Sequence, residues 1–444
     1  MKKSRSSVTL KIIILTVLTL LLLIPPLFVI NLIQERQDRS DGVKLEISSK
    51  WGTNKTINGP VISVPYKKWT TSQGGKKTYS VHYLHILPES LMVKSNMTPE
   101  KRYRGIYESV VYNADVQING EFVIPDLQLA GLNDDEVMWE DAQLYFGVSD
   151  MRGIKNKIII NWQGKEINAN PGIETEQIYE KGFGVKGLFE GKQETAAKFN
   201  FSTSININGS ESLMFTPVGK STFVEITSSW DTPSFTGNFL PRERSITSDG
   251  FTASWEVFHL NREFPQFWAD AKYYPQKSEF GVELKIPVDH YQKAMRTTKY
   301  AIMFIGLTFL AFFMIEIMNR LNVHPIQYLL TGFALIIFYT LLLSISEYLN
   351  FTFSYIIAAL AIIVQISLYS LSIFKEKSRA LVVSGVLLML YSYLFVVLQL
   401  EDFALLLGSV GLFTILGVVM YLTRKIDWSN ITQQPENEET PVDK

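Results

Sequence analysis

Cysteine is absent from all 444 residues of the chain. Its absence excludes disulfide bonds, thiolate metal sites and cysteine nucleophiles, and it is compatible with either a reducing or an oxidising compartment. An excess of charge of one sign is also missing, since the formal net charge is −1 and no long basic stripe occurs. Proteins that bind nucleic acid replace the counterions of the phosphates with clustered lysine and arginine. The sequence therefore predicts no nucleic-acid partner.

The short patterns that accompany catalysis are missing as well. There is no HExxH, no GxSxG and no Walker A loop, because residues 74–78, GGKKT, lack the upstream glycine. These residues are better interpreted as a hairpin tip. His82 and His85 could suggest a metal site, but residues three apart on a strand point to opposite faces and cannot close one tetrahedral shell. We therefore predict that the protein is not an enzyme and has no catalytic residues, no metal and no cofactor.

Long apolar runs, by contrast, are plentiful. Residues 324–351, HPIQYLLTGFALIIFYTLLLSISEYLNF, carry almost no charge, and the run has the ~20 residues that a helix needs to cross ~30 Å of hydrocarbon. A run at residues 12–33 follows a basic N-terminus without a small-x-small cleavage site, which indicates an uncleaved signal anchor, kinked at Pro25 and Pro26. Four further runs occupy residues 300–318, 352–374, 380–398 and 403–423. The sequence thus predicts an integral membrane protein with a six-helix transmembrane bundle.

Between the first and second apolar runs, the hydrophobic period changes to two. In residues 199–208, Phe and Ile alternate with Asn and Ser, which is typical of a strand with one wet face. Asn119-Gly120 and Asn208-Gly209 each predict the type I′ turn of a hairpin. Similar short runs recur at residues 61–66, 79–87, 142–148, 157–162, 223–230, 251–260 and 280–286. These strands predict a large, mainly antiparallel β domain that resembles a sandwich.

Basic residues in the short loops predict the orientation in the membrane. The clusters at residues 375–379 and 424–425 alternate with the loops at 347–350 and 399–402, which contain no lysine or arginine. The positive-inside rule then places both termini in the cytoplasm and the β domain in the periplasm. A helix at residues 288–299 is expected to run directly into the second span. The predicted parts are residues 1–34, a cytoplasmic N-terminus and signal anchor; 35–296, the periplasmic β domain; 297–425, a five-helix transmembrane bundle; and 426–444, a disordered cytoplasmic tail.

Eight segments spread over nearly the whole chain carry a family resemblance. They are WGTNKTINGPVISVPY, LPESLMVKSNMTPEKRYRGIYESVVYNADVQINGEF, SFTGNFLPRERSI, ASWEVFHLNREFPQ, KYAIMFIGLTFLAFFMIE, HPIQYLLTGFALIIFYTLLLSISEYLNF, LQLEDFALLLGSVGLF and TRKIDW. With these segments the chain resembles the CreD family of bacterial inner membrane proteins, often called cell envelope integrity proteins. The resemblance implies an inner membrane location in Gram-negative bacteria. It also implies a link to envelope-stress or carbon-responsive two-component regulation, without an established catalytic activity.

Polar side chains within the apolar runs are candidate site residues, because a charge in hydrocarbon costs ~2.5–3.5 kcal/mol on insertion scales. Glu316 lies about one turn from the cytoplasmic end of its helix, where Arg320 at i+4 can pair with it and His324 opens the next helix. Gln365 falls near the midplane of the fourth of the six predicted spans, residues 352–374. At this depth an amide most often hydrogen-bonds a neighbouring helix. We interpret these groups as contacts between helices in preference to an ion path.

A second set of charges lies at the predicted outer surface of the membrane. Glu347, Glu401 and Asp402 fall in tight outer loops, and Arg296 and Lys299 lie on the helix that enters the membrane at the same surface. We predict that Arg296 or Lys299 pairs with Glu347 or with the Glu401-Asp402 turn. The alternative is that all these groups are solvated or face lipid headgroups.

The segment RYRGIYESVVY concentrates residue types that are enriched at binding hot spots. Its candidate binding surface comprises Arg102, Tyr103, Arg104 and Tyr107. The alternative, which we favour, is a strand that enters the sheet with these side chains lying over apolar surface.

The sequence as a whole predicts a non-enzymatic inner membrane protein that contributes to cell envelope integrity or the envelope stress response through its periplasmic domain. Its expected partners are the lipid bilayer and other envelope proteins. The alternative is a carrier or lipid-handling protein that uses Glu316, Gln365 and Glu347, although the inverted repeats common in secondary transporters are missing from the sequence.

Overall fold

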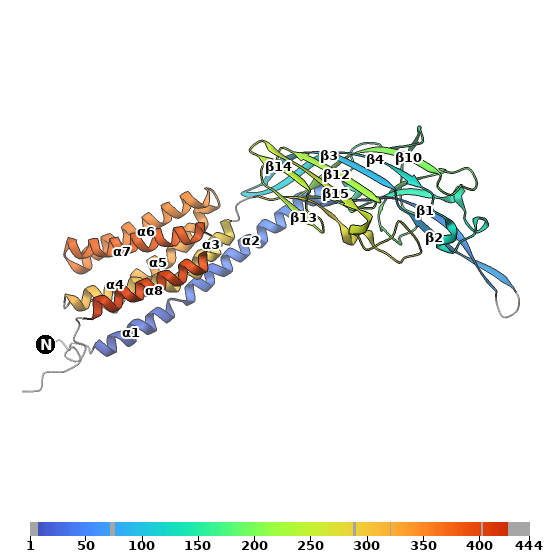
Figure 1. The fold of residues 1–444 in the computed structure, drawn as a ribbon. Helices are drawn as coiled ribbons and strands as arrows, with labels where there is room; N and C mark the ends of the chain where they lie inside the picture. The colour runs from blue at the N-terminus through green and yellow to red at the C-terminus, as the bar shows by residue number, and fades with distance from the viewer. Residues whose placement is uncertain (1–7, 72–75, 287–289, 320, 401–402, 425–444) are drawn as a thin grey trace, which may run out of the picture. The chain divides into compact units, whose positions relative to one another are not determined.

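The chain divides into two compact units, which we call the helical unit and the β unit. The computed structural model describes residues 8–71, 76–286, 290–319, 321–400 and 403–424. The helical unit comprises Met1–Arg39 with Val288–Lys444, and the β unit comprises Ser40–Pro287. Figure 1 shows the helices of the first unit and the sheets of the second. The boundaries predicted after residues 34 and 296 fall inside helices α2 and α3.

Most helices of the chain are apolar and lie in the helical unit. Their bounds are α1 (Val8–Leu21), α2 (Ile24–Trp51), α3 (His290–Lys299), α4 (Ala301–Met318), α5 (Pro325–Ser346), α6 (Phe351–Phe374), α7 (Lys377–Gln399) and α8 (Ala404–Thr423). Among the described residues, five stretches are long and apolar enough to cross a membrane: Leu10–Trp51, α4, α5, α6 and α7. The sixth predicted run coincides with α8, whose apolar stretch, Leu406–Tyr421, is shorter.

The helices are interrupted at two junctions. The N-terminal helix is interrupted at Leu22 and Leu23, so Pro25 and Pro26 lie in the first turn of α2, where a missing N–H costs little. The predicted kink is therefore an interruption just before the prolines. The helix expected to run directly into the second span is also interrupted, because Tyr300 separates α3 from α4. That prediction of continuity was wrong.

The β unit contains two large sheets. The strands are β1 (Lys55–Thr71), β2 (Lys77–Ile86), β3 (Ser90–Arg104), β4 (Tyr107–Val123), β5 (Gln143–Val148), β6 (Ile159–Trp162), β7 (Lys165–Asn168), β8 (Asn170–Pro171), β9 (Gly182–Lys186), β10 (Lys198–Ser210), β11 (Ser212–Phe215), β12 (Ser221–Ser228), β13 (Pro233–Gly237), β14 (Glu243–Thr247), β15 (Gly250–Phe258), β16 (Phe267–Ala269) and β17 (Phe280–Leu284). Sheet A has nine strands, in the order β13-β17-β11-β1-β5-β9-β8, with β2 paired to β1 and β16 paired to β2. Sheet B has eight, in the order β14-β15-β12-β3-β4-β10-β6-β7.

Both sheets are mixed. Most neighbours are antiparallel, but β1 pairs with β11 in parallel and β3 pairs with β12 in parallel. Residues that alternate along each strand divide between an apolar and a polar face. Val93, Ile118 and Val224 lie side by side on three strands of sheet B and are 2%, 1% and 0% exposed. They join one hydrophobic cluster with residues of sheet A, so the two sheets share a core.

The hairpins predicted at the two Asn-Gly pairs were wrong. Asn119-Gly120 lies within β4 and Asn208-Gly209 lies within β10, each paired in register. At both glycines the neighbouring atoms come so close that a side chain cannot fit: a Cβ on Gly120 would lie 2.1 Å from the Ser90 carbonyl oxygen, and a Cβ on Gly209 would lie 2.3 Å from the Tyr112 hydroxyl. Glycine serves here for close approach inside a sheet. The β3–β4 turn is instead at Gly105, with φ 62°.

The hairpin predicted around residues 74–78 is present. β2 pairs with residues 62–71 of β1, from Ile62 and Ile86 to Thr71 and Lys77. Residues 72–75 lie outside the described part of the chain.

Candidate functional site

A polar hollow on the outer face of sheet B is the first candidate, and we call it the amide hollow. It has a volume of ≈ 600 Å³, within the range of roughly 300–1,000 Å³ that is usual for ligand sites. Four neighbouring strands supply its side chains because alternate residues of each strand point to this face. The polar side chains that line it include Ser90, Asn119, Glu121, Asn161, Asn200 and Ser202.

The polar groups of the amide hollow are largely unengaged. No residue that the structure describes hydrogen-bonds the amides of Asn119 and Asn200, or the hydroxyl of Ser202, and all three side chains are exposed. The carboxylate of Glu121 is paired with Lys198, with Oε1 3.1 Å from Nζ. Amides and hydroxyls both donate and accept hydrogen bonds. The hollow therefore offers donors and acceptors together, with little net charge.

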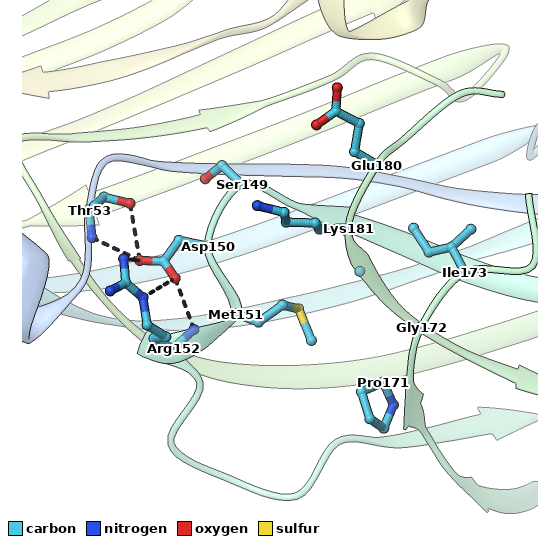
Figure 2. Close-up of a pocket in the computed structure, with 11 residues that line it drawn as sticks. Thr53, Ser149, Asp150, Met151, Arg152, Pro171, Gly172, Ile173, Glu180 and Lys181 are labelled. Atoms are coloured by element: carbon cyan, nitrogen blue, oxygen red, sulfur yellow. Dashed lines mark hydrogen bonds and ion pairs between the residues drawn. The ribbon is translucent and has the colours of Figure 1, made fainter. Parts of the chain in front are cut away.

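A second hollow, of ≈ 590 Å³, lies beside Asp150 (Figure 2). Asp150 Oδ1 accepts hydrogen bonds from the backbone N–H of Arg152 at 3.1 Å and from its Nε at 3.0 Å, and Oδ2 accepts one from the Thr53 hydroxyl at 3.1 Å. Glu180 and Lys181 add one charge of each sign to the lining. Because the carboxylate is saturated by protein donors, Asp150 holds this corner of the fold together and has little capacity left for a ligand.

Beneath this hollow, Lys55 is completely buried. Its Nζ lies 2.8 Å from the Asp150 carbonyl oxygen and 3.1 Å from Oδ2, and none of the side chain is exposed. Burial lowers the pKa of Lys55, and Asp150 opposes that change. Burial would by itself raise the pKa of Asp150, but the hydrogen bonds from Arg152, Thr53 and Lys55 hold it well below its usual range. The pair joins the start of β1 to the loop after β5.

His82 and His85 point to opposite faces of β2, as the strand geometry predicts. His85 is buried between Ser63 and Gln177, at 2.7 Å from the Ser63 hydroxyl and 2.9 Å from the Gln177 side-chain oxygen. Burial lowers its pKa to about 4. His82 is partly exposed, with Nδ1 2.9 Å from Asp270 Oδ1. Among the described residues, no group of three or more His, Cys, Asp or Glu side chains could hold a metal ion.

The candidate binding surface around Arg102 lies at the tip of the β3–β4 hairpin. Arg104 pairs with Glu46 of α2, and the guanidinium carbon of Arg102 lies 4.7 Å from the centre of the Trp51 ring. Tyr103, by contrast, is 65% exposed. Tyr107 faces Arg104 across the turn. The two arginines therefore brace the hairpin against the end of α2 within the β unit, and these contacts reduce their availability to a partner.

In the helical unit, Glu316 forms the centre of a buried polar cluster. It is 3% exposed, near the end of α4. Its Oε2 accepts a hydrogen bond from the Tyr328 hydroxyl at 2.8 Å, and Oε1 accepts one from the backbone N–H of Val323 at 2.8 Å. Lys11 of α1 forms an ion pair with Glu316 and also lies 3.2 Å from Asn322 Oδ1. One carboxylate thus ties α1, α4 and α5 together.

The sequence located Glu316 but not its partners. The expected partner, Arg320, lies outside the described residues. His324 is exposed and caps α5, because its Nδ1 accepts the Ile326 N–H at 3.3 Å. The signal that could have revealed Lys11 is its place directly before the first apolar run, in the same helix α1, where a cation near hydrocarbon needs a counter-charge.

At the other end of α5, Glu347 has a different basic partner from the predicted ones. Arg36 of α2 lies 3.7 Å from Glu347 Oε1, and the Tyr291 hydroxyl lies 3.4 Å from the same oxygen. Arg296 is half-buried and Lys299 is exposed on α3. The predicted turn of Glu401 and Asp402 lies outside the described residues. Arg36 lies four residues before the first residue of the β unit, Ser40, and was not among the predicted partners.

The amide of Gln365 contacts no neighbouring helix among the residues that the structure describes. The side chain is exposed on α6, and no hydrogen bond joins it to any residue within the described ranges. The outcome differs from the expected contact between helices.

Comparisons with known proteins agree over nearly the full length of the chain. The family described as inner membrane protein CreD matches residues 7–429. A curated relative, inner membrane protein CreD of Escherichia coli (strain K12), is 33% identical over 414 residues, which cover 92% of this chain and 91% of the relative.

Solved structures add little. An M1 zinc metallopeptidase mutant of Deinococcus radiodurans with a bound Tyr-Ser-Ala substrate matches with 10% identity and a TM-score of 0.18, over 39% of each chain. The unmutated enzyme of the same organism matches with 8% identity and a TM-score of 0.19, over 39% of this chain and 38% of the enzyme. The chain thus spans about two fifths of these structures, and a likeness this low supports no conclusion about fold or activity.

Proposed function

The chain belongs to the CreD family of inner membrane proteins, and from that premise we propose that it maintains the cell envelope by binding, without catalysis. In this proposal the helical unit anchors the protein with six membrane-spanning helices, including α8, and with both termini in the cytoplasm. The β unit lies in the periplasm. The charges of the short loops support this orientation.

The observation that carries the proposal is the amide hollow. Its unengaged amides and hydroxyls suit a neutral ligand whose own groups both donate and accept hydrogen bonds at short intervals. A glycan strand has this chemistry. A peptide usually binds a sheet by adding a strand at its edge. Here β4 is already paired with β3 on one side and β10 on the other, so no backbone edge is open at the hollow. We therefore favour a polyhydroxylated polymer of the envelope as the ligand.

Sedimentation of the full-length protein with isolated peptidoglycan sacculi tests the proposal. Wild-type protein should sediment with the sacculi, and the double variant Asn119→Ala/Asn200→Ala should bind roughly tenfold more weakly, as expected for two hydrogen bonds of ~0.5–1.5 kcal/mol each. Gln117→Ala is the matched control, because Gln117 is an exposed amide on the same face of β4 outside the hollow. Equal binding by all three proteins, or no binding by wild type, contradicts the proposal.

The alternative of a carrier finds less support in the geometry. Both carboxylate oxygens of Glu316 are engaged by protein donors, and Gln365 faces outward from α6. Glu347 is at the opposite end of α5 from Tyr328, the partner of Glu316. These three residues do not line a common path, which favours their role as helix contacts.

A further inference from the structure

An exposed amide in the middle of a membrane helix requires a partner. Gln365 follows the first residue of α6 by fourteen positions and precedes the last by nine, so it lies ~21 Å and ~14 Å from the two helix ends. Lipid tails offer no hydrogen bonds, and an unsatisfied polar group in hydrocarbon is costly. The described residues of its own chain leave this amide unengaged, so its hydrogen bonds are available to a second molecule.

The face of α6 that carries Gln365 is apolar and accessible. Val364 is 54% exposed and Leu368 is 63% exposed, one residue before and three after the glutamine. Ala361, one turn before Gln365, is also exposed. A small residue at that position lets a second helix approach the backbone closely. We call the exposed face formed by Ala361, Val364, Gln365 and Leu368 the Gln365 face.

We propose that the Gln365 face binds the same face of a second copy of this chain. All copies insert into the membrane in one orientation, so a two-fold axis along the membrane normal places each Gln365 at the depth of the other. An amide carries both donors and acceptors, so two glutamines satisfy each other. A lipid tail cannot do so, and an unrelated helix would need its own polar residue at this depth.

The chain contains no cysteine, so a single introduced cysteine is the only thiol of the chain that can form a disulfide. Ala361→Cys places a thiol on the Gln365 face. Met389→Cys on α7 is the matched control: Met389 is 72% exposed, and the hydrogen bond from Ser384 to Ser367 sets it at nearly the same depth as Ala361. Native membranes carrying each variant are oxidised and analysed by non-reducing electrophoresis. Ala361→Cys should form a disulfide dimer, and Met389→Cys should not.

The contribution of the amide is tested in the Ala361→Cys background. Gln365→Leu should weaken association by roughly 3- to 20-fold, which corresponds to the ~0.6–1.7 kcal/mol measured for hydrogen bonds between membrane helices. Gln365→Asn should retain most of the dimer, and equal amounts of each variant in the membrane fraction show that insertion is intact. The proposal is overturned by equal cross-linking of Ala361→Cys and Met389→Cys, by a dimer that Gln365→Leu leaves unchanged, by the absence of any cross-link, or by a disulfide to a protein of another mass.

Discussion

Lys55 Nζ lies 3.1 Å from Asp150 Oδ2 at a point where no surface of the lysine reaches solvent. Such a pair is costly to desolvate, and it persists because further hydrogen bonds complete it. The Asp150 carbonyl oxygen accepts one from Lys55, and Arg152 and Thr53 donate others to the carboxylate. Removal of Lys55 takes away the buried counter-charge of Asp150 and leaves it only the largely exposed Arg152, whereas removal of Asp150 leaves the Lys55 ammonium buried without a counter-charge.

Lys55→Met should lower the free energy of unfolding of the β unit by about 3–5 kcal/mol, the usual cost of breaking a buried ion pair. Arg152→Ala is the control, because its side chain is 68% exposed and such pairs contribute only ~0–1 kcal/mol. Urea titration followed by tryptophan fluorescence reports on this unit, since seven of the eight tryptophans lie between residues 51 and 268. An equal loss of unfolding free energy in the two variants would show that the burial of Lys55 does not determine the cost of breaking its ion pair.

The stability of the β unit should fall as pH is lowered from about 6.5 to 4. Burial lowers the pKa of His85 to about 4 in the folded state, against 6.5 for an ordinary histidine. The unfolded chain therefore binds a proton that the folded chain excludes, and the difference costs up to about 3 kcal/mol at the acidic end. Urea titrations across this range measure the slope. His85→Gln should reduce the slope; the same slope in wild type and in this variant would exclude His85 as its source.

Glu316→Gln and Lys11→Met should each destabilise the helical unit, by about 3 kcal/mol, because each leaves the opposite charge buried. The double variant should lose less than the sum of the two, since the second change removes the orphaned charge. Thermal unfolding of detergent-solubilised protein measures the cycle. Additive losses would mean that the two residues act independently.

Charge reversal should reveal the pair at the other end of α5. Glu347→Arg places a second cation beside Arg36 and should impair envelope integrity. The measurement is the sensitivity of a complemented deletion strain to detergent. Adding Arg36→Glu should restore it. Adding Lys299→Glu, at one of the two partners expected from the sequence, Arg296 and Lys299, should restore less. Rescue by Lys299→Glu alone would favour the original prediction.

Reporter fusions should establish the proposed topology. Fusions after Asn350 and Asp402 should be active in the periplasm, and fusions after Lys377 and Lys425 in the cytoplasm, as the loop charges require. A cytoplasmic signal from a fusion within the β unit would overturn the whole arrangement.

Patterns that arise from local chemistry were predicted well. The apolar runs at residues 324–351 and 352–374 match α5 and α6 closely, because hydrophobic length alone defines such helices. The alternation of residues 199–208 matches the buried and exposed faces of β10. The opposite orientations of His82 and His85 were also predicted from the two-residue period of side chains along a strand.

Features that depend on distant parts of the chain were not predicted. Lys11 and Glu316 meet only after α1 packs on α4, and no local pattern pairs them. No local pattern marks Lys55, yet the fold buries it completely. The glycines of the two Asn-Gly pairs are needed for close contacts with Ser90 and Tyr112, which a single strand does not disclose.

The parallel strand pairs in the two sheets delay folding during synthesis of the chain. β1 and β3 leave the ribosome early, but their parallel neighbours β11 and β12 begin only at Ser212 and Ser221. Such distant pairing slows folding, because a long loop must close before the contacts form. β17, the neighbour of β11, ends at Leu284. A growing chain that stops before this residue therefore holds unpaired strand edges, the surfaces at which β-rich chains aggregate.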